Sequence, residues 1–436
     1  MLIIDVGFSA TSIRAVISVE EHLDRVLAET RLLGYESVTL DQARGRCLAE
    51  TVVSTVPVPP WTNSAMDGYA VRAADLEGAS ADSPVSLKVV ADIPAGSGED
   101  PEIGPAEAAR IMTGAPLPSS ADTVIPQELT DGGLQTVAIS EALPRGRHVR
   151  LSGEDHEAGS VVATAGTELT PEVLTSIASA GIGRIMVSVR PRVAVISTGD
   201  ELMPPGAGLA RGQIPDSNGL LVSFLAGDAG AVAVTDYAAD SPDELQAAID
   251  RHRSEADVLV ITGGVSVGAY DPVRALFEGG SPVRFDRVAM QPGKPQAFGR
   301  LGEGTSGETG PLVFGLPGNP VSAWVSFQMF VRPALRKLQG FSTLVPSPVP
   351  ARAGADWKTP KNRMQVIPAR IYDDENREVL PAAEGGSGSH LIASLAGADG
   401  YALVDSDVES IRAGDRVLSV RLRDPEQFNH QQRSKS

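Results

Sequence analysis

The segment 192–338 constrains the fold most, because continuous apolar runs alternate there with helical patterns. Apolar runs at 193–196, 258–261 and 311–314 each lead into a glycine-bearing turn, and residues with helical character follow. Strands that are apolar throughout are buried on both faces, which is typical of a parallel sheet covered by helices on both sides. We therefore predict that residues 189–338 form a doubly wound α/β domain, which binds its ligand at the carboxyl ends of the strands.

Two other regions are predicted to be mainly β. Residues 41–155 contain short β-like runs broken by Pro, Gly and Asp, without a long periodic helix, and are predicted to form a mainly β insertion domain. A proline-rich linker begins at residue 341, and short strands with glycine-rich turns predict a C-terminal β barrel over 345–423. The predicted fold class is therefore multi-domain, with α/β and β parts.

The remaining segments are short. Capping and amphipathic patterns predict helices within 17–40 and 156–188, which we group as one linker and dimerisation domain. Residues 1–16 precede the first helix and are expected to be an N-terminal extension. The polar residues 424–436 are expected to form a disordered tail.

Composition excludes several classes of function. The net charge of −18 opposes binding to nucleic acid or to an anionic membrane, because both would be repelled at long range. No apolar run reaches the length of about 18–20 residues that a membrane span requires, and the start of the chain lacks a secretory pattern. We therefore expect a cytoplasmic protein. The single cysteine, Cys47, and the spacing of the histidines argue against a disulfide or a zinc site.

The turn after the strand 258–261 is a candidate phosphate site. It reads Thr262-Gly263-Gly264-Val265-Ser266, and backbone N–H groups in such a turn cradle an anion, with Ser266 as an added donor. The alternative is that the glycines serve only tight packing. Asp271 follows closely and is a candidate ligand for Mg²⁺ bridging phosphate oxygens.

Three further motifs are ambiguous when each is considered alone. Lys294 stands between Gly293 and Pro295, which suits a point charge aimed at an oxyanion. The turn 316–320 leads from a strand into a helix, where free N–H groups are available. Asp67 precedes Gly68, and Asp-Gly is also the commonest signal for a two-residue hairpin turn.

Taken together, these motifs form a series. Seven short segments follow one another in the chain: Ser64-Ala65-Met66-Asp67-Gly68-Tyr69-Ala70, Arg110-Ile111-Met112-Thr113-Gly114-Ala115, Gly153-Glu154-Asp155, Ser197-Thr198-Gly199-Asp200-Glu201-Leu202, Gly263-Gly264, Pro292-Gly293-Lys294-Pro295 and Leu316-Pro317-Gly318-Asn319-Pro320. In this order they resemble the MoeA/gephyrin E-domain family of molybdopterin molybdenumtransferases. The resemblance extends over about residues 17–422.

The resemblance implies an architecture and a reaction. Family members are elongated homodimers of four domains, with the active cleft between subunits, and segment 189–338 matches the domain shared with the adenylyltransferase that makes the substrate. The implied reaction takes molybdate and adenylylated molybdopterin, cleaves the phosphoanhydride and yields molybdenum cofactor and AMP. Mg²⁺ is the expected cofactor. Contacts with that adenylyltransferase and with maturation proteins of molybdoenzymes are also expected.

The resemblance assigns roles to individual residues. Asp67 and Asp155 are expected to be catalytic, with Asp67 acting in the hydrolytic step and Thr113 donating to substrate oxygens. Glu201 and Asp271 are expected to hold the metal. The residues expected to bind the substrate are Glu201, Asp240, Gly263, Gly264, Ser266, Asp271, Arg287 and Lys294. For Asp240, a second carboxylate at a helix start is at least as good an interpretation.

Molybdate would bind beside a further group of residues. By resemblance these are Pro317, Pro320, Arg363 and Ser389, and a guanidinium and a hydroxyl are suitable ligands for a tetrahedral oxyanion. Many relatives carry Lys where Gln291 stands here, which leaves Lys294 and Arg287 with more of the anion binding. Two alternatives stay open: a molybdopterin adenylyltransferase, and a non-catalytic scaffold like gephyrin.

Overall fold

The computed structural model describes residues 16–265, 271–279, 281–302, 310–373, 377–383, 388 and 391–423. It divides into two compact units, one formed by residues 36–187 and the other by the chain before and after them. The N-terminal extension, except Val16, and the expected C-terminal tail lie outside the described residues.

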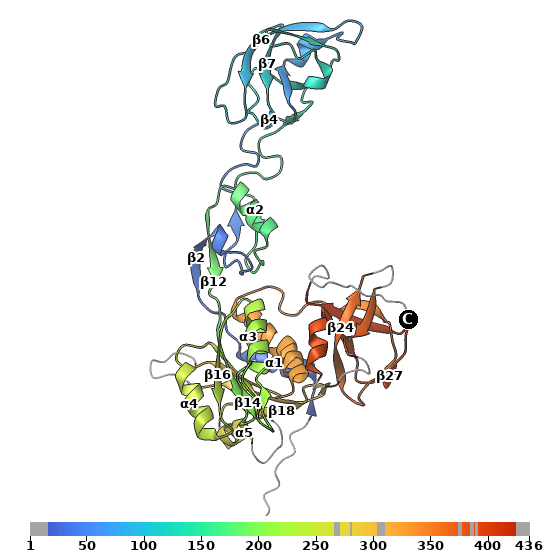
Figure 1. The fold of residues 1–436 in the computed structure, drawn as a ribbon. Coiled ribbons are helices and arrows are strands. Elements are labelled where there is room, and N and C mark those ends of the chain that lie inside the picture. The colour runs from blue at the N-terminus through green and yellow to red at the C-terminus, as the bar shows by residue number, and fades with distance from the viewer. Residues whose placement is uncertain are drawn as a thin grey trace, which may run out of the picture. The chain divides into compact units, whose positions relative to one another are not determined.

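A seven-stranded sheet is the centre of the larger unit (Figure 1). Its order is β1 (Val16–Ile17), β18 (Arg284–Val288), β20 (Pro295–Arg300), β21 (Leu312–Leu316), β17 (Val258–Thr262), β13 (Arg192–Thr198) and β16 (Val232–Ala238). The last four strands are parallel, whereas β20 runs antiparallel to both of its neighbours. The predicted parallel sheet is confirmed, with one reversed strand.

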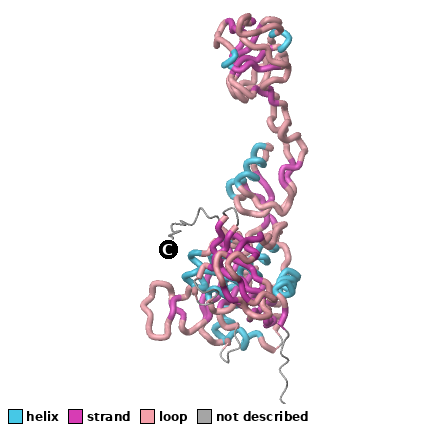
Figure 2. Tube along the Cα trace, turned by 90° about the vertical axis from the view of Figure 1, so that its right-hand side faces the viewer, coloured by secondary structure: helices cyan, strands magenta, loops and turns pink. Residues whose placement is uncertain are grey.

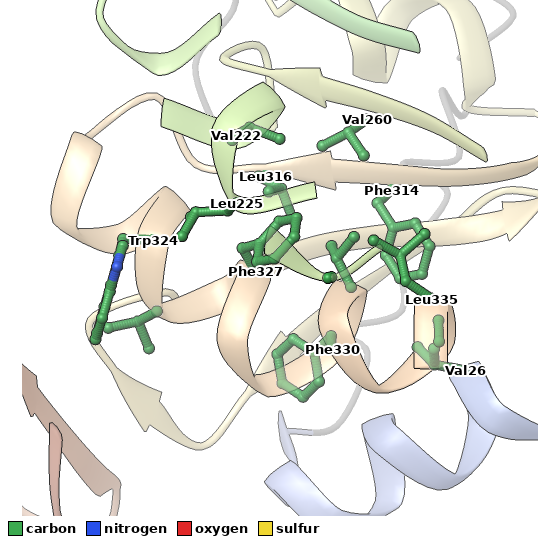
Figure 3. Close-up of a cluster of buried hydrophobic side chains, with 14 of the residues drawn as sticks. Val26, Val222, Leu225, Val260, Phe314, Leu316, Trp324, Phe327, Phe330 and Leu335 are labelled. Atoms are coloured by element: carbon green, nitrogen blue, oxygen red, sulfur yellow. The ribbon is translucent and has the colours of Figure 1, made fainter. Parts of the chain in front are cut away.

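Helices cover both faces of this sheet, as the apolar strands predict. Along β13, Val193 and Val195 belong to one buried cluster, and Ala194 and Ile196 belong to the other. The first cluster packs under α1 (Val19–Glu29), α3 (Asn218–Asp228), α6 (Pro320–Ser326), the π-helical turn η4 (Phe327–Val331) and α7 (Arg332–Leu338) (Figure 3). The second packs under α4 (Pro242–His252) and α5 (Pro272–Phe277). This is a doubly wound domain.

Ile261 offers a measure of how tightly this core is packed. Its side chain is fully buried on β17. We expect Ile261→Val to lower the free energy of unfolding by about 0.5–1.5 kcal/mol, because it leaves a methyl-sized cavity. Chemical denaturation measures this. Val234→Ala is the control, since Val234 is 50% exposed, and a change there beyond about 0.5 kcal/mol would contradict the assigned burial.

The N-terminal helix differs from expectation. We grouped residues 17–40 with 156–188, but residues up to Tyr35 belong to the α/β unit. The reason is a buried contact: the His22 Nδ1 atom lies 3.1 Å from a carboxylate oxygen of Asp286 on β18, and the imidazole packs edge-on to Phe330. Val26 of the same helix is fully buried beneath α7.

The C-terminal residues form the predicted barrel. Strands β24 (Met364–Tyr372), β25 (Glu378–Pro381), β22 (Val349–Ala353), β28 (Arg416–Arg421) and β26 (Gly400–Val404) pair in that order, and β24 with β26 closes the ring. The short strand β19 (Met290–Gln291) of the α/β domain pairs with β24, so the two domains share main-chain hydrogen bonds. The smaller elements are β14 (Leu202–Met203), β15 (Ile214–Pro215), β23 (Trp357–Lys358), β27 (Ser410–Ile411) and the 3₁₀ turn η5 (Ile392–Gly397).

The smaller unit contains the predicted mainly β domain. A five-stranded sheet runs β8 (Thr123–Pro126), β5 (Gly68–Val71), β7 (Glu107–Ile111), β6 (Val85–Ile93) and β9 (Thr136–Ile139), with a buried cluster on each side. Its helical segments are only the short turns η2 (Ala73–Leu76) and η3 (Gln127–Leu129) (Figure 2). The strands β4 (Asn63–Ser64) and β10 (Val149–Arg150) pair where the chain enters and leaves this domain.

The boundary predicted at residue 41 lies elsewhere. Ala43 and Leu48 are buried with Leu169 and Ile177, in one core with the segment predicted as linker. That core is formed by β2 (Tyr35–Thr39), η1 (Leu40–Gln42), β3 (Val52–Val53), β11 (Val161–Ala163), α2 (Pro171–Ser179) and β12 (Arg184–Ser188). The polar, turn-rich sequence after residue 40 resembles a β domain, but burial against residues distant in sequence determines the core to which it belongs.

Among the described residues, the helices are too short or too polar to span a membrane.

Candidate active site

A cavity of about 840 Å³ opens at the carboxyl ends of the parallel strands. The turns after β13, β17 and β21 form its floor, and β15, the start of α3 and Ile392 of the barrel complete its wall. The residues expected to be catalytic or to bind ligands that line it are Glu201, Asp240, Gly263, Gly264, Asp271, Pro317 and Pro320. Arg287, Lys294 and Arg363 are not among its lining residues. The position predicted from the doubly wound pattern therefore contains a real cavity.

The Gly263-Gly264 turn is shaped by close approach of the backbone. Both glycines have positive φ, +94° and +63°, a region that L side chains rarely adopt. A Cβ on Gly263 would lie 2.7 Å from the carbonyl oxygen of Thr198, and the Gly263 N–H donates to the carbonyl of Leu316. Gly263 is thus required for close packing against Thr198, and the turn also lines the cavity. Ser266 lies outside the described residues.

Gly264 can be tested separately from backbone strain. A Cβ at Gly264 would lie 2.8 Å from Val273. We expect Gly264→Ala to cost about 1–2 kcal/mol of stability through its φ, and to weaken AMP binding because Val273 and the turn must separate. Gly414→Ala also places a side chain at positive φ, +92°, but with nothing within 4 Å. Equal AMP affinity in the two variants, by calorimetry, would contradict a ligand role for the Gly264 turn.

Three carboxylates gather on one side of the cavity. The side-chain carboxylates of Asp200 and Asp240 each accept a hydrogen bond from the backbone N–H of the other residue, and Glu201 is next in sequence to Asp200. Burial raises the pKa of Asp240 above its ordinary value, and the charges of Glu201 and Asp200 raise it further, against the backbone hydrogen bond from Asp200. A cation placed here would relieve this repulsion.

Asp271 lies against the glycine turn. It is buried, and its Oδ1 atom accepts the backbone N–H of Arg274, so it caps α5. A Cβ on Gly264 would lie 3.3 Å from the same oxygen, which puts the carboxylate beside the turn. Its capping role was not anticipated from the sequence.

The two residues expected to hold Mg²⁺ both line the cavity. Glu201 and Asp271 supply hard oxygen ligands on the lining of the cavity. Within the described ranges, His, Cys, Asp and Glu form no group of three or more that could hold a metal by themselves. Mg²⁺ is commonly bound by one or two carboxylates together with waters and substrate phosphates. The arrangement therefore suits a metal that arrives with a phosphorylated ligand.

Three cations converge next to the cavity. Lys294 is flanked by Gly293 and Pro295, which both line it. Partial burial lowers the pKa of Lys294, and the positive charges of Arg287 and Arg363 lower it further. These three residues are therefore close enough to repel one another, and an anion bound among them would relieve that repulsion.

Strand pairing explains how residues so far apart in sequence meet. Met290 and Gln291 pair with Met364 and Gln365, which brings Arg363 to the start of the Lys294 segment. The N–H of Val288, next to Arg287, donates to the carbonyl of Lys294. The cluster thus combines two residues of the α/β domain with one of the barrel.

Pro317 and Pro320 form part of the same wall. Pro320 occupies the first turn of α6, where a missing N–H is tolerated. The carbonyl of Gly318 between them accepts a hydrogen bond from the Asn218 side chain at 2.7 Å. These prolines shape the wall rather than donate to a ligand. Ser389, the other residue expected to bind molybdate, lies outside the described residues.

Asp67 and Thr113 form a tight pair in the smaller unit. One oxygen of the exposed Asp67 carboxylate accepts both the backbone N–H and the hydroxyl of Thr113, each at 2.7 Å. These two hydrogen bonds lower the pKa of Asp67, so it is ionised at neutral pH. Gly68 is required by close strand pairing, since its Cβ would overlap the carbonyl of Ile125. The carboxylate is therefore held in a fixed direction and remains accessible.

Asp155 has a different setting. Its backbone N–H donates to Val58 where two connecting segments run side by side. Among the described residues its exposed carboxylate makes no hydrogen bond or ion pair. The catalytic role expected for Asp155 therefore remains a prediction.

Some residues in or beside the cavity were not anticipated. Asp216 accepts the N–H of Gly219, Asn218 ties α3 to Gly318, and Tyr237 donates to the carbonyl of Gly199. The polar run 216–218 at the start of a helix was the sequence signal available for Asp216 and Asn218. No local sequence signal pointed to Tyr237, because only the pairing of β16 with β13 brings it to the turn.

Comparison with known proteins places the chain among relatives of one kind. Three family profiles match: the MoeA N-terminal region (domain I and II) over residues 17–181, a probable molybdopterin binding domain over 194–337, and the MoeA C-terminal region (domain IV) over 350–422. Together they account for both units and for the barrel.

Full-length relatives and solved structures agree. The chain is 42% identical to molybdopterin molybdenumtransferase 2 of Mycobacterium tuberculosis, with 92% of this chain and 98% of that protein covered. It is 33% identical to the molybdopterin molybdenumtransferase of Bacillus subtilis, with 94% and 95% covered. A crystal structure of the molybdopterin biosynthesis MoeA protein of Pyrococcus horikoshii matches with a TM-score of 0.76 and 33% identity, covering 93% of this chain and 99% of that one.

Proposed function

Because the chain belongs to the MoeA family of molybdenum cofactor biosynthesis, we propose that it is a molybdopterin molybdenumtransferase. In the proposed reaction it inserts molybdate into adenylylated molybdopterin and releases AMP, which yields molybdenum cofactor. The carrying observation is the adjacency of two anion sites. A glycine-rich turn at the strand ends lines the cavity, and so do Gly293 and Pro295. Lys294 stands between these two residues and is close enough to Arg287 and Arg363 to be repelled by their charges.

This adjacency suits the two substrates. The volume of about 840 Å³ is in the range of pockets that hold a nucleotide-sized molecule. Molybdate is a small dianion, and guanidinium and ammonium groups bind such oxyanions by charge-assisted hydrogen bonds. Lys294, Arg287 and Arg363 also offset locally the net charge of −18, which would otherwise repel both ligands.

The chemistry would be carried by this chain's acids. Asp67 is ionised and held by Thr113, so it can accept the proton from a water that attacks the phosphoanhydride, as the P–O bond breaks and AMP leaves. Thr113 orients Asp67 as well as being a candidate donor to substrate oxygens. Bound Mg²⁺ would supply charge neutralisation of phosphate oxygens, with Glu201 and Asp271 holding it. We further propose a cytoplasmic homodimer, as the family resemblance implies.

One assay separates this function from its rivals. We would incubate the protein with adenylylated molybdopterin, molybdate and Mg²⁺ and measure AMP. Release of AMP that depends on molybdate is the expected result. Consumption of ATP with free molybdopterin would instead identify an adenylyltransferase. The absence of both reactions would identify a non-catalytic scaffold, and either of these results overturns the proposal.

The metal role of Glu201 has its own test. Mn²⁺, titrated in the presence of AMP and followed by the loss of its free electron paramagnetic signal, reports binding without turnover. We expect Glu201→Gln to weaken Mn²⁺ binding by roughly five- to tenfold, because one of two carboxylate ligands loses its charge. Glu172→Gln changes an exposed carboxylate on α2 and is the control. Identical titrations for both variants would remove Glu201 from the metal site.

A further inference from the structure

A second cluster of cations lies on the barrel, on strands other than the one that follows Arg363. A pocket of about 220 Å³ is lined by Arg352, Arg377 and Arg416, together with Pro350 and Ala351. The arginines come from β22, from the residue before β25 and from β28. None of them belongs to the cavity described above, and no motif of the sequence analysis includes them.

Strand register holds two of the guanidinium groups together. Arg352 and Arg416 are direct partners in the antiparallel pairing of β22 with β28. Side chains of directly opposite residues project from the same face with their Cβ atoms about 5 Å apart, and like charges in such a pair destabilise a sheet. This arrangement costs stability unless something negative lies between the two side chains.

The third arginine is tied to the same place through the main chain. The N–H of Arg352 donates to the carbonyl of Arg377 at 2.7 Å. The Arg352 guanidinium donates to the carbonyl of Gly414 at 3.0 Å, which fixes its direction. The main chain therefore positions the three arginines around the pocket, and the Arg352 side chain is also fixed by a hydrogen bond.

The chain does not neutralise this pocket within its described part. There, neither Arg352 nor Arg416 has a carboxylate within ion-pair distance, and Arg377 pairs only with Asp373, at 3.5 Å. Glu378 is the other register partner of Arg352, but its side chain packs over Gly354, whose Cβ would lie 2.9 Å from the carboxylate carbon. The described lining of this pocket is therefore positive, in a chain with a net charge of −18.

We infer that Arg352, Arg377 and Arg416 form a second oxyanion site, which takes inorganic phosphate or the phosphate end of a nucleotide. Planar guanidinium groups bind tetrahedral oxyanions through paired N–H donors, and arginine is preferred over lysine where that geometry matters. The volume of about 220 Å³ admits such a group and is about a quarter of that of the strand-end cavity, about 840 Å³. This inference does not depend on the proposed transferase function.

The test uses the whole protein with inorganic phosphate as the probe. Phosphate affinity is measured by calorimetry for the unchanged chain, for Arg352→Gln with Arg416→Gln, and for Lys294→Ala. We expect the double variant to lose at least tenfold in affinity for one class of site, which Lys294→Ala retains. Arg145→Gln removes an 83% exposed arginine and is the control for net charge. Thermal unfolding verifies that each variant is folded.

Two further outcomes bear on the inference. An equal loss for AMP and phosphate supports a site for any phosphoryl group, and a loss for phosphate alone supports a site for the free anion. Arg416→Glu should raise the unfolding temperature, because it converts a repulsive cross-strand pair into an attractive one, while abolishing phosphate binding there. Phosphate affinity that is unchanged in the double variant, or lost only in Lys294→Ala, would overturn the inference.

Discussion

Asp67→Asn is expected to lower molybdate-dependent AMP release by about 10²–10⁴-fold, the usual contribution of a general base. The substitution keeps the shape of the side chain but removes its charge, so it can no longer take a proton from water. Asp67 is exposed, and within the described residues the hydrogen bonds to its carboxylate come from Thr113. We therefore expect the thermal unfolding profile to remain that of the unchanged chain.

A close structural match to Asp67 provides the control. Asp100 is also an exposed carboxylate of the smaller unit, it also accepts a backbone N–H, from Ser119 at 2.8 Å, and that hydrogen bond likewise lowers its pKa. Asp100→Asn should leave AMP release unchanged. If the two variants turn over at the same rate, whether fast or slow, Asp67 has no special part in the reaction.

The pH dependence follows from the same pair. A lowered pKa keeps Asp67 ionised to more acidic pH than an ordinary carboxyl group, and protonation inactivates it as pH falls through that pKa. Thr113→Val removes the hydroxyl donor but keeps the backbone N–H, which is the larger cause. The acid limb of the rate profile should therefore move upward in pH, by less than it would if both hydrogen bonds were lost.

Lys294→Ala is expected to raise the KM for molybdate roughly 10- to 100-fold, which corresponds to the loss of one charge-assisted hydrogen bond. The same substitution should not destabilise the fold, although it weakens molybdate binding. The pKa of Lys294 is lowered by burial and by Arg287 and Arg363, so its charge is disfavoured in the folded chain without ligand. Removing it should leave the free energy of unfolding unchanged or slightly increased.

Weaker molybdate binding without a loss of stability distinguishes a lysine that binds an anion from a lysine that stabilises the fold. Lys88→Ala removes a 71% exposed lysine that pairs with Glu107 and should affect neither quantity. Steady-state kinetics with varied molybdate and denaturant unfolding supply the two measurements. A Lys294→Ala variant that is clearly less stable yet binds molybdate normally would show that the lysine serves the fold.

The local sequence was sufficient to predict the elements that carry the site. The apolar strands 193–196 and 258–261 specify burial on both faces, and the glycines that follow them specify turns, so a doubly wound sheet with a strand-end cavity was predictable. The C-terminal barrel was predictable from its short strands and glycine-rich turns. The functional meaning of Gly263 was harder to assign, because close packing against Thr198 explains that glycine equally well.

Long-range contacts were not predictable from local patterns. Residues 17–35 belong to the α/β unit because His22 meets Asp286, a residue 264 positions away. Ala43 and Leu48 pack with 163–187 rather than with the following β sheet. The convergence of Arg363 on Lys294 depends on the pairing of β19 with β24, and without the family resemblance nothing in the sequence near Arg363 indicated it.

The central claim is that the strand-end cavity and the cations beside it bind two anions, and crystallography with molybdate and AMP tests it directly. Anomalous scattering from molybdenum locates the oxyanion independently of any assumption about the ligand. The account requires a molybdenum peak beside Lys294, Arg287 and Arg363, with the AMP phosphate over the Gly263-Gly264 turn. Well-ordered crystals soaked at saturating concentrations, with neither ligand at these two positions, would contradict it.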